Sequence, residues 1–317
     1  MAKKYDVVTA GGIVADILAR PVDEGIFERF VTDMESITFM PGGDAQNEAI
    51  TLTQLGCKVA LSGLMGTDLF GGMVYNYTSE KGVDMTYVIR TSDINTNISI
   101  CLVRPDGQRH FLSLKGCAEA YGIDHFDMKL LEQTRAFNIG SIFSLKKFDG
   151  AEAALVLKRA KELGVITSAD TGGDRYGIGL KGIAECLSNL DYFIPSEYEI
   201  AGLTGEDDIE KNADILLGMG VKNVIIKMGR RGCFIKNSEV AKRCRTYLVK
   251  PIDTTGSGDN FVAGFLSAVL EGKSLEECAM RGNACGSLNS TQLGATGAVK
   301  SMEQVLEFMR VTPFEPD

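Results

Sequence analysis

A glycine-rich loop late in the sequence carries residue types that could hold a phosphoryl group during its transfer. The loop reads Asp-Thr-Thr-Gly-Ser-Gly-Asp-Asn from Asp253 to Asn260, and it follows the strand-like stretch Tyr247–Ile252. Apolar residues at helical spacing come after it and predict a long helix. Backbone N–H groups at the start of a helix bind anions, because they point outward and the helix dipole adds positive charge. We therefore expect an anion site where this loop enters the helix.

Asp259 is the residue of this loop that could do acid–base chemistry. A carboxylate beside an anion hole can accept the proton of a hydroxyl that attacks phosphorus, while the amides hold the transferred oxygens. The alternative is that Asp259 only stabilises the first turn of the helix through the helix dipole. The loop is not a Walker A motif, since GxxxxGK[ST] occurs nowhere in the chain, and Phe261 occupies the third glycine position of a GxGxxG fingerprint.

A second group of residues with binding chemistry lies near the N-terminus. Residues 41–49 read Pro-Gly-Gly-Asp-Ala-Gln-Asn-Glu-Ala. The glycine pair Gly42 and Gly43 lets the backbone approach a ligand closely, and Asn47 on a first helical turn offers a donor and an acceptor to a hydroxyl. A turn followed by a capped helix would explain the same residues without a ligand.

The composition excludes several classes of function. The 317 residues include 33 Lys and Arg against 42 Asp and Glu, and this net charge of −9 argues against a large basic surface for nucleic acid or an anionic membrane. Any anionic ligand must therefore be held by a local site. His110 and His125 are the only histidines, which excludes multi-histidine zinc sites.

The cysteines and the apolar pattern indicate a cytoplasmic protein. The eight cysteines are scattered without a CxxC pair, which favours buried thiols in a reducing compartment over a disulfide framework. The first residues leave no room for the apolar core of a signal peptide. No stretch approaches the roughly 18 apolar residues of a membrane span, so we expect no membrane partner. The net negative charge leads us to expect no nucleic acid partner either.

Short β-rich runs alternate with amphipathic stretches and would position these motifs. The predicted strands are Asp6–Ala10, Val59–Gly63, Phe137–Ile142, Val165–Ala169, Tyr192–Ile194 and Val224–Lys227. Their alternation with helices predicts an α/β fold with a mostly parallel central sheet and helices on both faces. Ligands of such a sheet bind outside the carboxyl ends of the strands. Because no linker or repeat divides the chain, we expect a single domain over residues 1–317.

One part of the chain breaks this alternation. Asn97–Arg104 and Gln108–Leu114 flank a Pro-Asp-Gly turn and predict a β-hairpin. A segment after the first strand also fits a crossover helix badly, so we expect a small additional sheet from about residues 14–40 and 95–116. Its edge or apolar face needs cover, which a bound substrate, a second subunit or both would provide.

Together these motifs resemble the ribokinase-like (PfkB) carbohydrate kinase family over essentially the whole chain. The glycine pair with Asn47 resembles the family's N-terminal signature. The family element that follows this signature matches Gly63, Gly66, Asp68 and Gly71. The loop from Asp253 to Asp259 resembles the C-terminal signature, which is the most specific of the three. The resemblance implies a ribokinase-like three-layer fold with a β-sheet lid. It also implies an ATP- and Mg²⁺-dependent kinase that phosphorylates a hydroxymethyl group of a small ribose- or fructose-like sugar.

The resemblance further implies roles for individual residues. The catalytic base is matched by Asp259, and the anion hole by Gly256, Ser257 and Gly258. Sugar-binding positions are matched by Asp16, Gly42, Gly43 and Asn47. Nucleotide-binding positions are matched by Lys227, Gly229, Gly232 and Asn283. Glu199 matches a residue that binds magnesium through water, and many relatives bind potassium at the positions of Asp253 and Thr255.

Some positions depart from the family pattern. Ser196 replaces the asparagine of the family's Asn-x-x-Glu motif, and Asp44 stands where a lysine commonly follows the glycine pair. Residues 170–175 lack the Asp-x-Asn-x-Arg of many fructose and ketodeoxygluconate kinases. A nucleoside kinase is the alternative activity, and a non-catalytic sugar or nucleotide sensor is the alternative from another class. Since the family's lid often also forms a dimer interface, we expect a homodimer through the lid.

Overall fold

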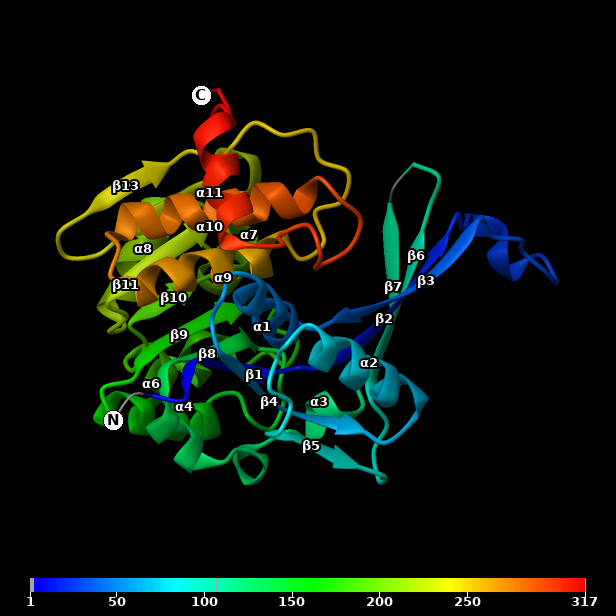
Figure 1. The fold of residues 1–317 in the computed structure, drawn as a ribbon, viewed down its shortest axis with the longest axis horizontal. Coiled ribbons are helices and arrows are strands. Elements are labelled where there is room, and N and C mark those ends of the chain that lie inside the picture. Colours follow the sequence, from blue (N-terminus) through cyan, green and yellow to red (C-terminus); the bar gives the residue numbers. More distant parts are fainter. Residues whose placement is uncertain (1–2, 107, 317) are drawn as a thin grey trace.

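The central feature of the fold is a large, mostly parallel sheet with a smaller sheet beside it (Figure 1). The computed structural model describes residues 3–106 and 108–316. The strands of the large sheet are β1 (Tyr5–Gly11), β4 (Val59–Gly66), β5 (Val88–Thr91), β8 (Thr134–Ile142), β9 (Ile166–Thr171), β10 (Tyr192–Ile194), β11 (Asn223–Lys227), β12 (Cys233–Lys236) and β13 (Ala241–Cys244). Their order is β13-β12-β11-β10-β9-β8-β1-β4-β5. The pairs from β11 to β5 are parallel, whereas β11–β12 and β12–β13 are antiparallel.

Helices cover both faces of the large sheet. They are α1 (Asp44–Gln54), α2 (Leu69–Glu80), α3 (Cys117–Ala120), α4 (Ala151–Glu162), α5 (Gly179–Gly182), α6 (Ala184–Leu187), α7 (Glu197–Thr204), α8 (Ile209–Gly218), α9 (Ser257–Leu270), α10 (Leu275–Ser290) and α11 (Met302–Val311), with short 3-10 turns at Glu24–Phe27, Ile123–His125, Met128–Gln133 and Gly229–Arg231. One buried apolar cluster contains side chains from α3, α4, α6 and α8, and a separate one contains side chains from α1, α2, α9 and α10. Each cluster includes strand residues, so the sheet lies between two layers of helices.

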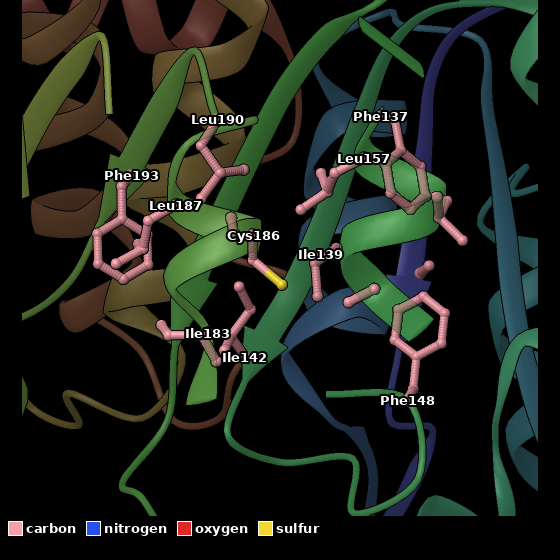
Figure 2. Close-up of a cluster of buried hydrophobic side chains, with 14 of the residues drawn as sticks. Phe137, Ile139, Ile142, Phe148, Leu157, Ile183, Cys186, Leu187, Leu190 and Phe193 are labelled. Atoms are coloured by element: carbon pink, nitrogen blue, oxygen red, sulfur yellow. The ribbon is translucent and has the colours of Figure 1, made fainter. Parts of the chain in front are cut away.

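The first cluster shows how the sequence pattern produces this packing (Figure 2). Phe137 and Ile139 of β8 alternate with residues of the opposite face, and Ile142 joins them because the register with β9 shifts after Ile139. Leu157 of α4 and Cys186 of α6 belong to the same cluster. Burying each large apolar side chain stabilises the fold by about 1.5–3 kcal/mol. This packing fixes the strands whose carboxyl ends carry polar residues.

The predicted small sheet is present and has four strands in the order β3-β2-β6-β7. Its strands are β2 (Val14–Arg20), β3 (Ser36–Gly42), β6 (Asn97–Val103) and β7 (Arg109–Leu114). β6 and β7 form the predicted hairpin, closed by a bond of 2.8 Å from the Arg104 N–H to the Gln108 carbonyl. Gly107 of its turn lies outside the described residues. All residues of β7 are exposed, including Phe111, Leu112 and Leu114.

The predicted strands of the large sheet and the helix after the glycine loop are confirmed, but one strand is wrong. Within Tyr247–Ile252 only Tyr247 forms an isolated bridge, with Phe314. The Tyr247 ring instead packs against the C-terminal segment, 5.4 Å from that of Phe308, and the N–H groups of Leu248 and Ile252 donate to the carbonyls of Pro313 and Ser290. Strands β5, β12 and β13 were not predicted.

The eight cysteines are all free, and seven of them are buried, as the scattered spacing predicts. Across residues 3–106 and 108–316, no helix combines the length and the apolar character that crossing a membrane requires.

Candidate active site

A cleft of about 590 Å³ lies at the carboxyl ends of the parallel strands, where α/β sheets bind ligands. Asp170 near the end of β9 and Lys227 at the end of β11 line the cleft together with the start of α9. Glu199 of α7 and Asp44 of α1 also line it. The fold therefore brings residues from both halves of the chain to one cavity.

The glycine loop forms the open start of α9. Gly256 is the N-cap with φ +71°, and a Cβ added there would lie 2.5 Å from the Ala295 carbonyl oxygen, so only glycine fits. No side chain caps this helix end. The Ser257 N–H donates to the Thr254 carbonyl at 3.2 Å, whereas the next N–H groups of the first turn have no intrahelical acceptor. The Ser257 hydroxyl is buried without a hydrogen-bond partner. Ser257 and Gly258 both line the cleft, so these groups are suited to hold an anion there.

Asp259 lies on the first turn of α9 and is buried, with 8% of its surface exposed. The Asn47 amide nitrogen donates a hydrogen bond of 2.7 Å to its Oδ2. Burial raises the pKa of Asp259 well above its ordinary value, and the nearby Asp44 carboxyl raises this pKa further, although the Asn47 bond opposes them. A raised pKa makes this carboxylate a better proton acceptor near neutral pH.

The N-terminal motif reaches this loop because α1 packs on α9. The bond between Asn47 and Asp259 joins residues 212 positions apart, and Thr51 donates a second bond of 2.9 Å to Asn260. Gly43 caps α1 with φ +91°, and an added Cβ would collide with the carbonyl oxygen of Gly12. The predicted sugar-binding and catalytic motifs are therefore in direct contact.

Asp16 of β2 lies against the same motif from the small sheet. A Cβ added at Gly42 would collide with its carboxylate. Burial raises the pKa of Asp16 to about 6, against a lowering effect of the Ser99 hydrogen bond. Asp16 lines a hollow of about 20 Å³ together with Phe111 and Thr255, which places it where the small sheet meets the glycine loop.

A buried ion pair lies between the two sides of the cleft. The Lys227 ammonium is 2.6 Å from Oδ1 of Asp170, and a Cβ added at Gly258 would lie 3.3 Å from that ammonium. Desolvation lowers the pKa of Lys227, but the charges of Asp170 and Glu199 outweigh it and raise this pKa above its ordinary value. Lys227 therefore carries a positive charge between the Asp170 carboxylate and the glycine loop.

Glu199 is held in place by the residue that departs from the family pattern. The Ser196 hydroxyl accepts a bond of 3.3 Å from the Glu199 N–H, and Oε2 of Glu199 accepts one of 2.8 Å from the Ser196 N–H, which is a capping box. Oε2 also accepts a bond of 2.7 Å from the Thr171 hydroxyl. Serine thus positions Glu199 as part of the start of α7.

The donor set of the cleft fits magnesium that arrives with a ligand. Over the described part of the chain, no group of three or more His, Cys, Asp or Glu residues is arranged to hold a metal ion. Mg²⁺ keeps several waters and is commonly bound through one or two carboxylates and substrate phosphates. Glu199 lies in the wall of the cleft and fits the role of such a carboxylate.

Asp253 and Thr255 do not fit the expected potassium site. Oδ1 of Asp253 accepts bonds from the Thr255 N–H at 2.9 Å and the Arg109 guanidinium at 2.6 Å, and Oδ2 accepts one from the Gly294 N–H at 2.9 Å. The Thr255 carbonyl accepts a bond of 2.8 Å from Asn289. The oxygens that would coordinate the ion are therefore already occupied, and a cationic side chain lies among them.

The predicted nucleotide-binding residues lie along the same cleft. Its lining includes Lys227, Gly229, Gly232 and Asn283. The Asn283 amide donates bonds of 3.2 and 3.1 Å to the carbonyls of Cys244 and Arg245. It therefore holds the backbone against which Gly232 packs. The sequence did not indicate the ion pair of Lys227 with Asp170. Lys227 is the last residue of β11 and Asp170 lies near the end of β9, and β10 lies between these two strands.

Known proteins are similar to this chain in sequence and in fold. The model of the pfkB family carbohydrate kinases matches residues 6–302. A protein named probable fructokinase-5, from Arabidopsis thaliana, is 29% identical over 296 residues, which are 87% of this chain and 90% of the relative. A ribokinase of Haemophilus influenzae is 26% identical over 280 residues, 84% of this chain and 87% of the relative.

A solved structure leads to the same family. Arabidopsis thaliana ribokinase, complexed with ribose and ATP, has a TM-score of 0.82 at 25% identity and covers 98% of this chain and 99% of its own. The predicted ribokinase-like fold, with its large mostly parallel sheet and separate small sheet, is confirmed. The chain belongs to the pfkB family of carbohydrate kinases.

Proposed function

We propose that this protein is an ATP-dependent kinase that phosphorylates a hydroxymethyl group of a small ribose- or fructose-like sugar, with Asp259 as the general base. The observation that carries the proposal is the contact between Asn47 and Asp259 at the uncapped start of α9. In this proposal the Asn47 amide binds a sugar hydroxyl, Asp259 accepts its proton, and the start of α9 next to Asp259 forms the anion hole. This is the set of groups that phosphoryl transfer to an alcohol needs.

Each side of the cleft has a distinct task in this proposal. The sugar lies over Gly42 and Gly43, where Asp16 and Asn47 bind its hydroxyls. The nucleotide lies along Gly229, Gly232 and Asn283, with Lys227 beside its terminal phosphate. Asp259 takes the proton of the attacking hydroxyl, and the transferred oxygens are held by Gly256, Ser257 and Gly258. No step of this proposal uses potassium.

Glu199 is the residue that would hold magnesium, through water. When bound with the nucleotide, the ion neutralises phosphate charge that develops during transfer. Ser196 does not ligate the ion in this proposal, because its hydroxyl and its N–H are both occupied in the capping box with Glu199. The short serine is therefore compatible with magnesium use, since it acts by orienting the carboxylate.

The small sheet serves as a lid and as a dimer interface in this proposal. Large apolar side chains are exposed on its strands, among them Ile37, Phe111 and Leu114, and on the connection between β2 and β3, where Phe27 and Phe30 lie. Such a concentration of exposed apolar surface marks an interaction site, and exclusion of water from the donor is what a lid supplies in phosphoryl transfer. The free thiols support a reducing, cytoplasmic location.

A substrate panel tests the proposal. Purified protein is incubated with ATP, Mg²⁺ and one acceptor at a time, namely ribose, fructose, other pentoses and hexoses, or adenosine and inosine, and ADP release is followed. We expect a sugar to support the highest kcat/KM and mass spectrometry to locate the phosphate on a hydroxymethyl carbon. A nucleoside that exceeds every sugar would support the nucleoside kinase instead, and binding without turnover of any acceptor would support a sensor.

A further inference from the structure

We propose that Arg109 is a built-in cation for the glycine loop, which takes the place of a monovalent metal ion and couples closure of the small sheet to the shape of the anion hole. This inference rests on the proposed kinase function for its effect on turnover. Its structural content, a cation site filled by a side chain from the small sheet, is independent of the substrate.

The contacts of Arg109 carry the proposal. Arg109 is the first residue of β7 and lies 144 positions before Asp253 in the chain, yet its Nη2 donates a bond of 2.6 Å to Oδ1 of Asp253. Its Nη1 donates to the Thr255 hydroxyl. The Asp253 side chain is only 2% exposed, and that of Arg109 is 30% exposed. The guanidinium is therefore seated on a buried carboxylate and on the residue two positions further along the loop.

The oxygens at which relatives were expected to bind potassium are already occupied here. Both carboxylate oxygens of Asp253 and the carbonyl of Thr255 accept bonds from groups of the chain. Desolvation by burial raises the pKa of Asp253, but the bonds from Gly294, Thr255 and Arg109 outweigh it and lower this pKa below its ordinary value. A potassium ion would need these same oxygens and would be repelled by the guanidinium.

The geometry also shows how the charge of Arg109 reaches the anion hole. Asp253 fixes Gly294 through its Oδ2, and the next residue, Ala295, lies directly under the backbone of Gly256. Asn260 ties both sides together, because its amide donates bonds of 2.7 Å to the Gly256 carbonyl and 2.8 Å to the Ala295 carbonyl. The carboxylate that Arg109 neutralises is thus the anchor of the backbone that forms the anion hole.

The small sheet makes a second contact at the same place. A Cβ added at Gly294 would collide with the end of the Met40 side chain on β3. Phe111 and Thr255 border the small hollow between the two parts. The small sheet therefore packs against this loop through β3 and β7, and separation of the two parts would withdraw Arg109 and leave a buried, uncompensated carboxylate. A closed lid is then a condition for an ordered anion hole, and Arg109 is a positioning residue.

Two variants and a matched control test the inference. Arg109→Met removes the charge but keeps a long side chain, and Arg109→Lys keeps the charge without the paired donors. Arg104→Met is the control, because Arg104 stands at the other end of the hairpin turn and pairs with Glu24 instead of the glycine loop. Melting temperatures and turnover are measured in potassium chloride and in tetramethylammonium chloride of equal ionic strength.

We expect the melting temperature of the unmodified protein to be the same in both salts, and likewise that of Arg104→Met. The kcat of each protein should agree between the two salts within about twofold. Arg109→Met should lose up to about 100-fold in kcat, the cost of misplacing reacting groups by about 1 Å. Potassium or added guanidinium should restore part of this loss, and potassium should raise the melting temperature of this variant alone. Crystals of Arg109→Met soaked in thallium should show an anomalous peak at Asp253, and crystals of the unmodified protein should not.

The inference would be overturned if potassium raised the melting temperature of the unmodified protein or increased its kcat several-fold. An Arg109→Met variant with normal kcat in tetramethylammonium would overturn it as well. If Arg109→Met does not fold, Arg109→Lys decides the question through the same salt comparison. The melting and thallium measurements use no sugar, so they remain decisive even if the substrate panel finds no kinase activity.

Discussion

Replacement of Asp259 by asparagine tests two consequences of its buried carboxylate, namely its proposed role as proton acceptor in catalysis and its effect on the stability of the fold. The Asn47 amide donates a bond of 2.7 Å to Oδ2 of Asp259, and the amide oxygen of an asparagine can accept the same bond. Geometry and sugar binding should therefore persist while the proton acceptor is lost. Loss of a positioned general base costs about 10²–10⁴ in rate, which corresponds to about 3–5 kcal/mol of transition-state stabilisation.

The same substitution should stabilise the fold at alkaline pH. Burial raises the pKa of Asp259 in the folded protein, so the folded state binds the proton more tightly than the unfolded state, in which the pKa is about 3.9. The stability contributed by this group is then complete at low pH and declines as the pH rises towards the folded pKa. Asparagine does not titrate, so Asp259→Asn should melt at a higher temperature than the unmodified protein at pH 8, with a smaller difference at pH 5.

An assay that links ADP release to NADH oxidation gives kcat and KM, and calorimetry gives the melting temperatures. Asp149→Asn is the matched control, because burial raises the pKa of Asp149 to about 7 and this residue does not line the cleft. It should show the same pH-dependent gain in stability without loss of turnover. An Asp259→Asn variant that keeps kcat within threefold would refute the role of base, and one that melts lower than the unmodified protein at pH 8 would refute the argument from burial.

Three further substitutions probe the loop, the ion pair and the small sheet. Lys227→Met leaves its buried carboxylate partner unpaired and should lower the free energy of unfolding by about 3–5 kcal/mol in denaturant titrations; an unchanged midpoint would contradict the buried pair. Gly256→Ala combines a positive φ with a backbone clash and should reduce kcat by at least about tenfold, whereas Gly272→Ala, with φ +73° but open space, should leave kcat unchanged. Phe111→Asp should weaken self-association in light scattering and raise the KM for sugar, whereas Leu155→Asp, at the same 55% exposure on α4, should do neither; a monomeric unmodified protein would exclude the dimer.

The features that could be predicted from the sequence are those with a local signal. The glycine loop, the hairpin and the strand runs each depend on neighbouring residues, and the structure contains them. The capping box of Ser196 and Glu199 could also be predicted, since a serine followed three positions later by a glutamate is typical of a helix start. The strand expected at Tyr247–Ile252 failed because Tyr247 packs on the C-terminal segment and the Leu248 N–H donates to the Pro313 carbonyl instead of to a strand.

The contacts that depend on docking of separate segments could not be predicted. Nothing near Arg109 indicates that it meets Asp253, because the contact exists only once the small sheet lies against the glycine loop. The same holds for Lys227 and Asp170, which meet across an intervening strand. Of the two pairs, Lys227 and Asp170 line the cleft and influence its charge. The sequence therefore predicts which residues gather in the cleft better than it predicts their protonation.

That charge distribution explains why one carboxylate of the site is suited to proton transfer. Asp170 and Asp253 each bind a cationic side chain at 2.6 Å. Such pairing favours the ionised form of a carboxylate: it helps to lower the pKa of Asp253, whereas burial outweighs it at Asp170 and raises that pKa to about 7. Among the described residues, the side-chain hydrogen bond to Asp259 comes instead from the neutral amide of Asn47. A neutral donor at the same distance stabilises the anion less than a cation does, so burial remains the larger influence on the pKa of Asp259. Asp259 therefore has a neutral hydrogen-bond donor where Asp170 and Asp253 each have a cationic one, and the charge of Lys227 acts on it without a hydrogen bond. This arrangement suits the proposed role of Asp259 as proton acceptor.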